Sequence, residues 1–263
     1  MKNSDKIFNL ISTSSSLVAD HTEILRLSYP SSDLNGFQGG CSDGKRYYYQ
    51  VLMHYEFSNR EKEYSRIAKI DIREKKVVKY SDILSLDHGN DMTYHPAKNL
   101  LMVVNNKPHP SRITPIDPES LEVVGYEEAP LPIFALEYIP ELDVYAAGIS
   151  GEFAFCFLDN ELSLIDGRKY SMDQSAKRYT KQGLYADKDL IYFIFWDGKH
   201  AALEDFQSTI SIYDHSGNYK GDLDFNIGVQ EPENLSVMNG ELFAVCGKED
   251  GEPIIYHFEP KIK

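Results

Sequence analysis

The stretch from His88 to Asn106, HGNDMTYHPAKNLLMVVNN, predicts two β-strands joined by a turn. Met92 and Tyr94 alternate with Thr93, the turn segment HPAKN follows, and the run from Leu100 to Val104 is continuously apolar over the length of a strand. Two further strands and the turn between them are expected at residues 112–116, 121–124 and 117–120. Four short strands in about 35 residues are typical of one blade of a β-propeller.

The pattern of this stretch recurs along the chain. The centres of the five expected first strands are separated by 52, 44, 48 and 51 residues, and they are Gly40, Met92, Leu136, Leu184 and Leu235. Each expected third strand ends in an apolar residue and an acid, at Ile70-Asp71, Ile116-Asp117, Leu158-Asp159, Tyr213-Asp214 and Phe258-Glu259. An Asp side chain at this position accepts backbone N–H groups two residues later and starts a turn. The sequence therefore predicts an all-β, five-bladed propeller, because the alternative, a two-sheet sandwich, predicts no fivefold acidic marker.

A lone strand near the amino terminus is expected to close the ring. Residues Thr22–Tyr29 alternate apolar and polar side chains and stop at Pro30, with no hairpin partner nearby. The fifth blade lacks a fourth strand, and this segment can supply it, which removes two exposed edges. We expect one domain over residues 1–263, with 1–21 as a flexible arm and one short helical segment at Ala201–Phe206.

Composition limits the classes of partner. The net charge of −14, from 27 Lys and Arg against 41 Asp and Glu, repels nucleic-acid phosphates and anionic lipid surfaces. The three cysteines stand singly and are expected to be buried, reduced thiols. No apolar run approaches the ~20 residues of a membrane span. We expect a cytoplasmic monomer, although a mature secreted chain without its signal peptide would show the same features.

Polar side chains gather where the expected first strands begin. In a propeller these positions share one face with the loops that join second to third strands, and long loops on a rigid scaffold commonly bind ligands. Asp91 and Glu233 are predicted to act as acid or base. The predicted ligand-binding residues are Gln38, His54, His88, Asn90, Gln182, Trp196, His200 and Asn234. A structural interpretation stays open, in which residues 87–91 only form a turn and the other polar groups hydrate a channel.

Four segments resemble a known family. They are GFQGG at 36–40, HGNDMTY at 88–94, KQGLY at 181–185 and EPENLSVMNGELFAV at 231–245, and they resemble the blade starts of the plant and bacterial type of glutaminyl cyclase. In that family, polar side chains at these positions line a funnel in which an amino-terminal glutaminyl residue is cyclised. The resemblance implies that Glu233 and Asn234 lie where the family has Asn-Glu-Leu-Glu. Here the order is Glu-Asn-Leu-Ser, and the expected aromatic collar reduces to Trp196.

Three functions follow from these observations. The first is binding of a small polar molecule or peptide terminus in the axial funnel, with acid–base chemistry of a cyclotransferase kind. The second is a platform for a protein partner, without catalysis. The third is a cation-dependent hydrolase resembling lactonases, with no cofactor other than calcium at the channel mouth. Oxygen donors suited to calcium are present at Asn90, Asp91, Glu233 and Asn234.

Overall fold

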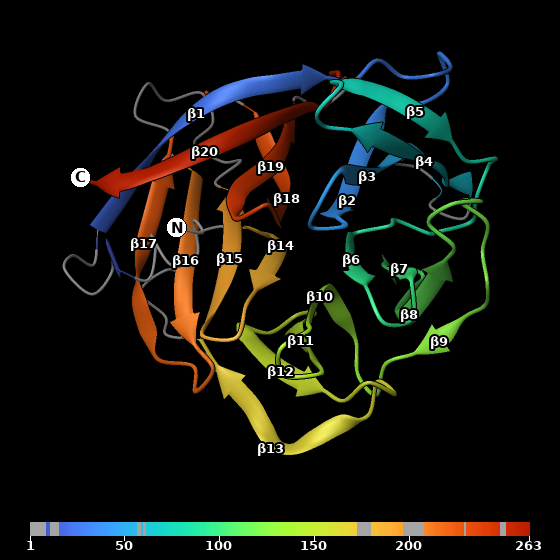
Figure 1. Ribbon diagram of the computed structural model, residues 1–263. Helices are drawn as coiled ribbons and strands as arrows, with labels where there is room; N and C mark the ends of the chain where they lie inside the picture. Colours follow the sequence, from blue (N-terminus) through green and yellow to red (C-terminus); the bar gives the residue numbers. More distant parts are fainter. Residues whose placement is uncertain are drawn as a thin grey trace.

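The computed structural model describes residues 9–10, 16–56, 59, 62–172, 180–196, 208–228, 230–247 and 251–263. Within this part of the chain, β-strands are the dominant element (Figure 1). The strands are β1 (Ser16–Arg26), β2 (Gly36–Ser42), β3 (Tyr47–His54), β4 (Tyr64–Asp71), β5 (Lys76–Tyr80), β6 (Asp91–His95), β7 (Leu100–Asn106), β8 (His109–Ile116), β9 (Glu127–Glu128), β10 (Ile133–Ile139), β11 (Val144–Ile149), β12 (Ala154–Leu158), β13 (Leu164–Ser171), β14 (Thr180–Ala186), β15 (Leu190–Trp196), β16 (Ser208–Asp214), β17 (Tyr219–Phe225), β18 (Glu231–Met238), β19 (Glu241–Gly247) and β20 (Ile254–Ile262). The helical segment expected at Ala201–Phe206 lies outside the described residues. None of the described helical residues forms a helix long and apolar enough to cross a membrane.

The strands form four sheets. Three sheets have four strands each, in the orders β2-β3-β4-β5, β6-β7-β8-β9 and β10-β11-β12-β13. The fourth has eight strands in the order β14-β15-β16-β17-β1-β20-β19-β18, and it consists of two four-stranded halves that meet where β1 pairs with β17. We call the five sets of four strands units one to five, numbered by their first strands β2, β6, β10, β14 and β18.

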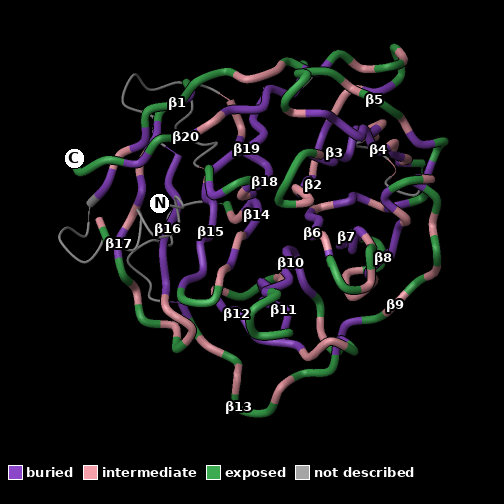
Figure 2. Tube along the Cα trace, in the orientation of Figure 1, coloured by how far each residue is buried: buried purple, intermediate pink, exposed green. Residues whose placement is uncertain are grey.

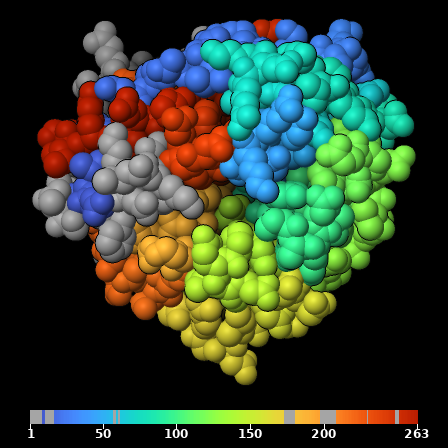
Figure 3. Space-filling view, viewed as in Figure 1, coloured from blue at the N-terminus to red at the C-terminus, as the bar shows by residue number. Residues whose placement is uncertain are grey.

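The first strands of the units lie innermost. Each contacts the next, from β2 to β6, β10, β14 and β18, and β18 contacts β2 again, so the fold is propeller-like (Figure 1). The space-filling view shows the same succession of segments around one face (Figure 3). Glycine permits the close approach of these strands: a Cβ atom on Gly39 would lie 2.5 Å from the Cα of Asp91, and one on Gly183 would lie 3.0 Å from the carbonyl oxygen of Glu233.

The hydrophobic core is divided among the five contacts between neighbouring units. Five clusters of buried side chains each draw on two adjacent units; one of them packs Met102 and Val104 of unit two against Leu136 and Tyr145 of unit three. The outer strands β5 and β13 have only exposed and half-buried residues, whereas β11 is buried throughout (Figure 2). All three cysteines are free and buried, which confirms the prediction of reduced core thiols.

The amino-terminal strand does pair with the last strand, but its position differs from the prediction. β1 runs antiparallel to β20 from Leu17–Ile262 to Arg26–Ile254, and its first residues pair parallel with Asp222–Asp224 of β17. Residues 16–21, expected in a flexible arm, therefore belong to the sheet. The physical reason is that Leu17 and Ala19 are buried in the core between units four and five, a role that the surrounding serines and polar residues conceal in the sequence.

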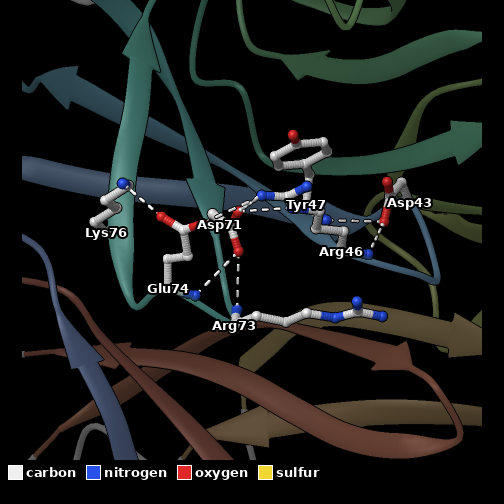
Figure 4. Close-up of polar contacts among 7 residues, drawn as sticks. All are labelled: Asp43, Arg46, Tyr47, Asp71, Arg73, Glu74 and Lys76. Carbon is white, nitrogen blue, oxygen red and sulfur yellow. Dashed lines mark hydrogen bonds and ion pairs between the residues drawn. The ribbon is translucent and has the colours of Figure 1, made fainter.

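The acidic markers start turns, as predicted, in four of the five units. The Oδ1 atom of Asp71 accepts the backbone N–H of Arg73 at 3.0 Å and of Glu74 at 3.1 Å, and its other oxygen pairs with Arg46 (Figure 4). Asp117, Asp159 and Asp214 accept backbone N–H groups in the same way. The prediction of a turn is wrong for the fifth acid, Glu259, which lies inside β20, a strand that continues to Ile262. No turn is needed there, because the fourth strand of unit five comes from the amino-terminal segment.

Candidate functional site

A cavity of about 690 Å³ opens where the inner strands begin. Each of the five units contributes a lining residue from this position, and these are Gln38, Asn90, Phe134, Gln182 and Glu233. His88 and Trp196 line the same cavity. Six of the predicted site residues are therefore brought together from segments spread along the chain.

β-Bulges aim several of these side chains. In β2, β10, β14 and β18 the pairing register shifts by one residue, and the shifts fall at Gln38, Phe134, Gln182 and Glu233. A bulge places an unpaired residue in the strand and re-aims its side chain. The bulges at the start of these inner strands therefore direct polar and aromatic side chains into the cavity.

Two glutamates of β18 form the acidic part of the cavity. Glu231 and Glu233 both line it, and the Gln182 side-chain amide donates a hydrogen bond to Glu231. Glu233 is only 5% exposed. Burial and the neighbouring charge of Glu231 raise the pKa of Glu233 well above its usual range, and no hydrogen bond from a described residue offsets this shift. Glu231 was missed because the first strand of this unit, centred on Leu235, was expected to begin at Asn234, whereas β18 already begins at Glu231.

Asp91, the other predicted acid–base residue, does not line the cavity. Its carboxylate is 2% exposed and accepts the backbone N–H groups of Met92 at 2.9 Å and Leu136 at 3.1 Å, as well as that of Leu184. Burial raises its pKa well above the usual value despite these bonds. The Asp91 carboxylate therefore links the inner strands of three units by accepting their backbone N–H groups, which is a structural role.

The side chain of Asn234 also forms its hydrogen bonds with protein groups. It is fully buried, Tyr48 donates its hydroxyl to the Asn234 Oδ1 atom, and the Asn234 amide donates to the carbonyl of Gln38 and to the Oε1 of Gln50, both at 3.2 Å. It holds the starts of β18 and β2 together without reaching the cavity. The arrangement departs from the prediction that Asn234 contacts a ligand.

A histidine and two asparagines form another side of the cavity. His88 Nδ1 lies 3.5 Å from the Oε2 of Glu63, whose side chain is fully buried, and its ring lies 5.5 Å from that of Tyr55. Asn90 donates to the carbonyl of Phe134 at 2.7 Å and accepts from the Asn106 amide at 2.8 Å. These contacts fix the orientation of the Asn90 amide before any ligand is present.

His54, predicted to bind a ligand, does not line the cavity. His54 Nδ1 lies 2.6 Å from the carbonyl oxygen of Asp33, and its ring stacks on Tyr64 at 4.8 Å, so it belongs to the outer loop contacts of unit one. His200, like the whole loop 197–207 that carries it, lies outside the described residues.

The cavity walls are more aromatic than the sequence suggested. Besides Trp196, the lining includes Phe37, Tyr55, Phe134 and Phe153. The prediction of a collar reduced to Trp196 is therefore wrong. Phe134 was expected at the channel mouth as the entry residue of its unit, and Phe37 could have been found in the same way, because it stands next to Gln38 at the start of an inner strand.

Lys181, next to Gln182 on β14, is a second residue that the sequence analysis missed. Its ammonium group donates to the carbonyl oxygens of Ile149, at 2.9 Å, and of Glu152, and it lies 4.3 Å from the centre of the Phe134 ring. Burial lowers the pKa of Lys181 to about 8. A partly desolvated lysine in a ligand cavity is a candidate for contacts with anionic or carbonyl oxygen atoms.

The oxygen donors proposed for calcium are dispersed. Asn90 and Glu233 line the cavity, whereas the side chains of Asp91 and Asn234 hydrogen-bond to protein groups. Among the described residues, no group of three or more His, Cys, Asp or Glu side chains is arranged to hold a metal ion. The calcium site stays a prediction.

Comparisons with known proteins bear on the fold. No family model and no curated protein sequence matches the chain. Among solved structures, glutaminyl cyclase from Myxococcus xanthus matches with a TM-score of 0.63 and 10% identity over 95% of this chain and 99% of that chain. A tail fiber of Staphylococcus aureus phage P68 matches with a TM-score of 0.62 and 11% identity over 91% of this chain, which spans about half (52%) of the tail-fiber chain. At these identities the likeness confirms a similarity of fold to glutaminyl cyclase and nothing finer.

Proposed function

We propose that the chain is a five-bladed β-propeller that binds a small polar molecule or peptide terminus through its amino group, with Glu233 as acid and base. The observation that carries this proposal is the Glu231–Glu233 pair in an aromatic-walled cavity. The five units, the cyclic contacts of their first strands and the five divided cores support the blade count.

The two carboxylates of the cavity favour a positively charged group on the ligand. Glu233 is buried beside Glu231, so the pair resists carrying two negative charges and retains a proton. A ligand ammonium group is attracted to these carboxylates and donates up to three hydrogen bonds. The faces of Trp196 and the neighbouring aromatic rings add cation–π attraction in a desolvated cavity.

Acid–base chemistry follows from the same arrangement. Binding of the ligand ammonium releases the proton of the glutamate pair to solvent, so that Glu233 is ionised in the complex. Glu233 then takes a proton from the bound ammonium, and the free amine attacks the carbonyl carbon of a side-chain amide in the same ligand. Glu233 returns the proton to the amide nitrogen as the carbon–nitrogen bond breaks, and the second proton of the attacking nitrogen follows. The products are a lactam and an ammonium ion, so atoms and charge balance. The fold similarity to glutaminyl cyclase favours this cyclisation over other acid–base reactions.

Binding is tested by thermal unfolding and calorimetry with glutaminyl-glycinamide and its N-acetyl derivative, which lacks the ammonium group. We expect only the first compound to stabilise the protein, by about 2.7 kcal/mol at 100 times its dissociation constant. The double variant Glu231→Gln/Glu233→Gln should abolish the response. Glu241→Gln, an exposed glutamate on the adjacent strand β19, is the matched control and should retain it.

Chemistry is tested separately by the release of ammonia from glutaminyl-glycinamide. Release that depends on Glu233 supports the cyclisation. Binding without release contradicts the reaction and leaves the binding proposal in place. Equal stabilisation by both compounds, or by neither, overturns the ammonium-binding proposal; a response to calcium alone would then favour the cation-dependent hydrolase, and no response at all would favour the protein-interaction platform.

A further inference from the structure

The cavity has a second charged feature beside the glutamate pair. Lys181 and Gln182 are consecutive residues of β14, and consecutive side chains of a strand point in opposite directions. Gln182 reaches Glu231 in unit five, whereas Lys181 reaches the carbonyl oxygens of Ile149 and Glu152 in unit three. The register shift of β14 begins after Lys181, and both side chains line the same cavity.

The ammonium group of Lys181 has no carboxylate partner within the described residues. Its two acceptors are backbone carbonyl oxygens, and the negative charge that acts on it is that of Glu152. The Glu152 carboxylate pairs instead with Lys169, with Nζ and Oε2 3.1 Å apart. An ammonium group has three N–H donors, so one remains beyond the two carbonyl bonds.

The surroundings of Lys181 strengthen its interaction with an anion. The Nζ atom lies 4.3 Å from the ring centre of Phe134 and 5.4 Å from that of Phe153, and both rings belong to the cavity wall. Rings and carbonyl groups hold the ammonium in place and exclude part of its water. A charge-assisted hydrogen bond to a carboxylate is shorter and stronger than a neutral one, and it is stronger still where the local dielectric constant is low.

We propose that the cavity takes a zwitterion, a free amino acid, whose ammonium group meets Glu231 and Glu233 and whose carboxylate meets Lys181. The ammonium half of this assignment rests on the proposed function. The carboxylate half is independent of it, because it comes from the unpaired charge of Lys181.

The carboxylate contact is tested with L-glutamine and L-glutaminamide, which differ only in the α-carboxylate. In the unchanged protein we expect glutamine to bind at least tenfold more tightly in calorimetry. Lys181→Met should remove this preference while leaving the affinity for glutaminamide within twofold. Lys169→Met, on the neighbouring strand β13 and paired with Glu152, is the matched control and should keep the tenfold preference.

The outcomes separate this inference from the proposed function. If glutaminamide binds as tightly as glutamine, or if Lys181→Met weakens both equally, the carboxylate contact is wrong and ammonium binding survives. If neither compound binds, both proposals fail. Should Lys181→Met not fold, sodium acetate supplies a second test in the unchanged protein: it should compete with glutamine and leave glutaminamide binding unaffected, and equal or absent competition overturns the assignment.

Discussion

The carboxylate of Asp91 accepts a hydrogen bond from the backbone N–H of Leu136, 3.1 Å away and 45 residues later in the chain. The same carboxylate accepts the N–H of Met92 in its own strand and that of Leu184 in unit four. One buried side chain thereby satisfies backbone donors of three inner strands. Residues of this kind are costly to change, because the donors left behind have no access to water.

Asp91→Asn should therefore destabilise the protein by about 1–3 kcal/mol, since one amide group is a donor and faces backbone donors. Urea unfolding measures this loss. Asn90→Ser, at the adjacent position and in the cavity wall, should cost less and serves as the comparison. If Asp91→Asn is as stable as the unchanged protein, the carboxylate is not holding the inner strands.

Glu233 should make stability depend on pH. Its pKa in the folded state lies well above the ordinary value of 4.5, so its contribution to stability is fully present below pH 4.5 and is lost as the pH rises through the folded pKa. Glu233→Gln removes this loss, and the variant should gain stability relative to the unchanged protein between pH 5 and pH 8. Urea unfolding at several pH values gives the difference, and a difference that shrinks with rising pH would contradict the burial of a charged pair.

Asp214 provides a comparison of opposite sign. Hydrogen bonds from Lys220 and Asn218 hold its pKa below the ordinary value of 3.8, although burial acts against them. Its contribution to stability is present above pH 3.8 and is lost as the pH falls through the folded pKa. Asp214→Asn should thus be less stable than the unchanged protein at pH 7, and the gap should close in acid.

The turn-forming acids predict a contrast between two similar positions. Asp159 accepts the backbone N–H groups of Glu161 and Ser163, both at 2.9 Å, whereas Glu259 lies within β20 and starts no turn. Asp159→Ala should cost about 1 kcal/mol in the free energy of unfolding, and Glu259→Ala should stay within about 0.5 kcal/mol. Equal costs would mean that the acidic marker has no role in the turns.

The amino-terminal strand offers a test of its packing. Leu17 is fully buried between units four and five, and its neighbour Val18 is half-buried. Leu17→Ala should lower the free energy of unfolding by about 2–5 kcal/mol. Val18→Ala should lower it less. Similar small effects at both positions would indicate that β1 contributes little to closing the sheet.

The sequence predicted the repeat and the position of the cavity, because both depend on local patterns. Turn acids act on backbone groups a few residues away, and strand starts gather on one face of a propeller-like fold. The sequence analysis assigned the same role to Asp91 and Glu233, since acids at the starts of two expected inner strands look the same until the backbone is known. The bulge at Glu233 turns its side chain into the cavity, while Asp91 begins an unbulged strand and points at Leu136.

Two other cavity residues were missed for related reasons. Glu231 precedes the strand that the sequence predicted, and only the structure shows that β18 begins there and that Glu231 lines the cavity. Lys181 reads as an ordinary exposed lysine of a strand start. Its flexible side chain crosses to unit three and meets the carbonyl oxygen of Ile149, which no periodic pattern in the sequence can indicate.

The pairing of β1 with β20 also sets the order in which a newly made chain reaches its final state. Residues 17–26 precede the four complete units in the chain, yet their antiparallel partners, residues 254–262, are translated only after those units. During the synthesis of some 230 intervening residues, at about 5–20 residues per second, the amino-terminal segment has to remain unpaired with its eventual neighbour. The ring therefore closes only after residues 254–262 have been made, so the four complete units can form before the unit that joins the two ends of the ring.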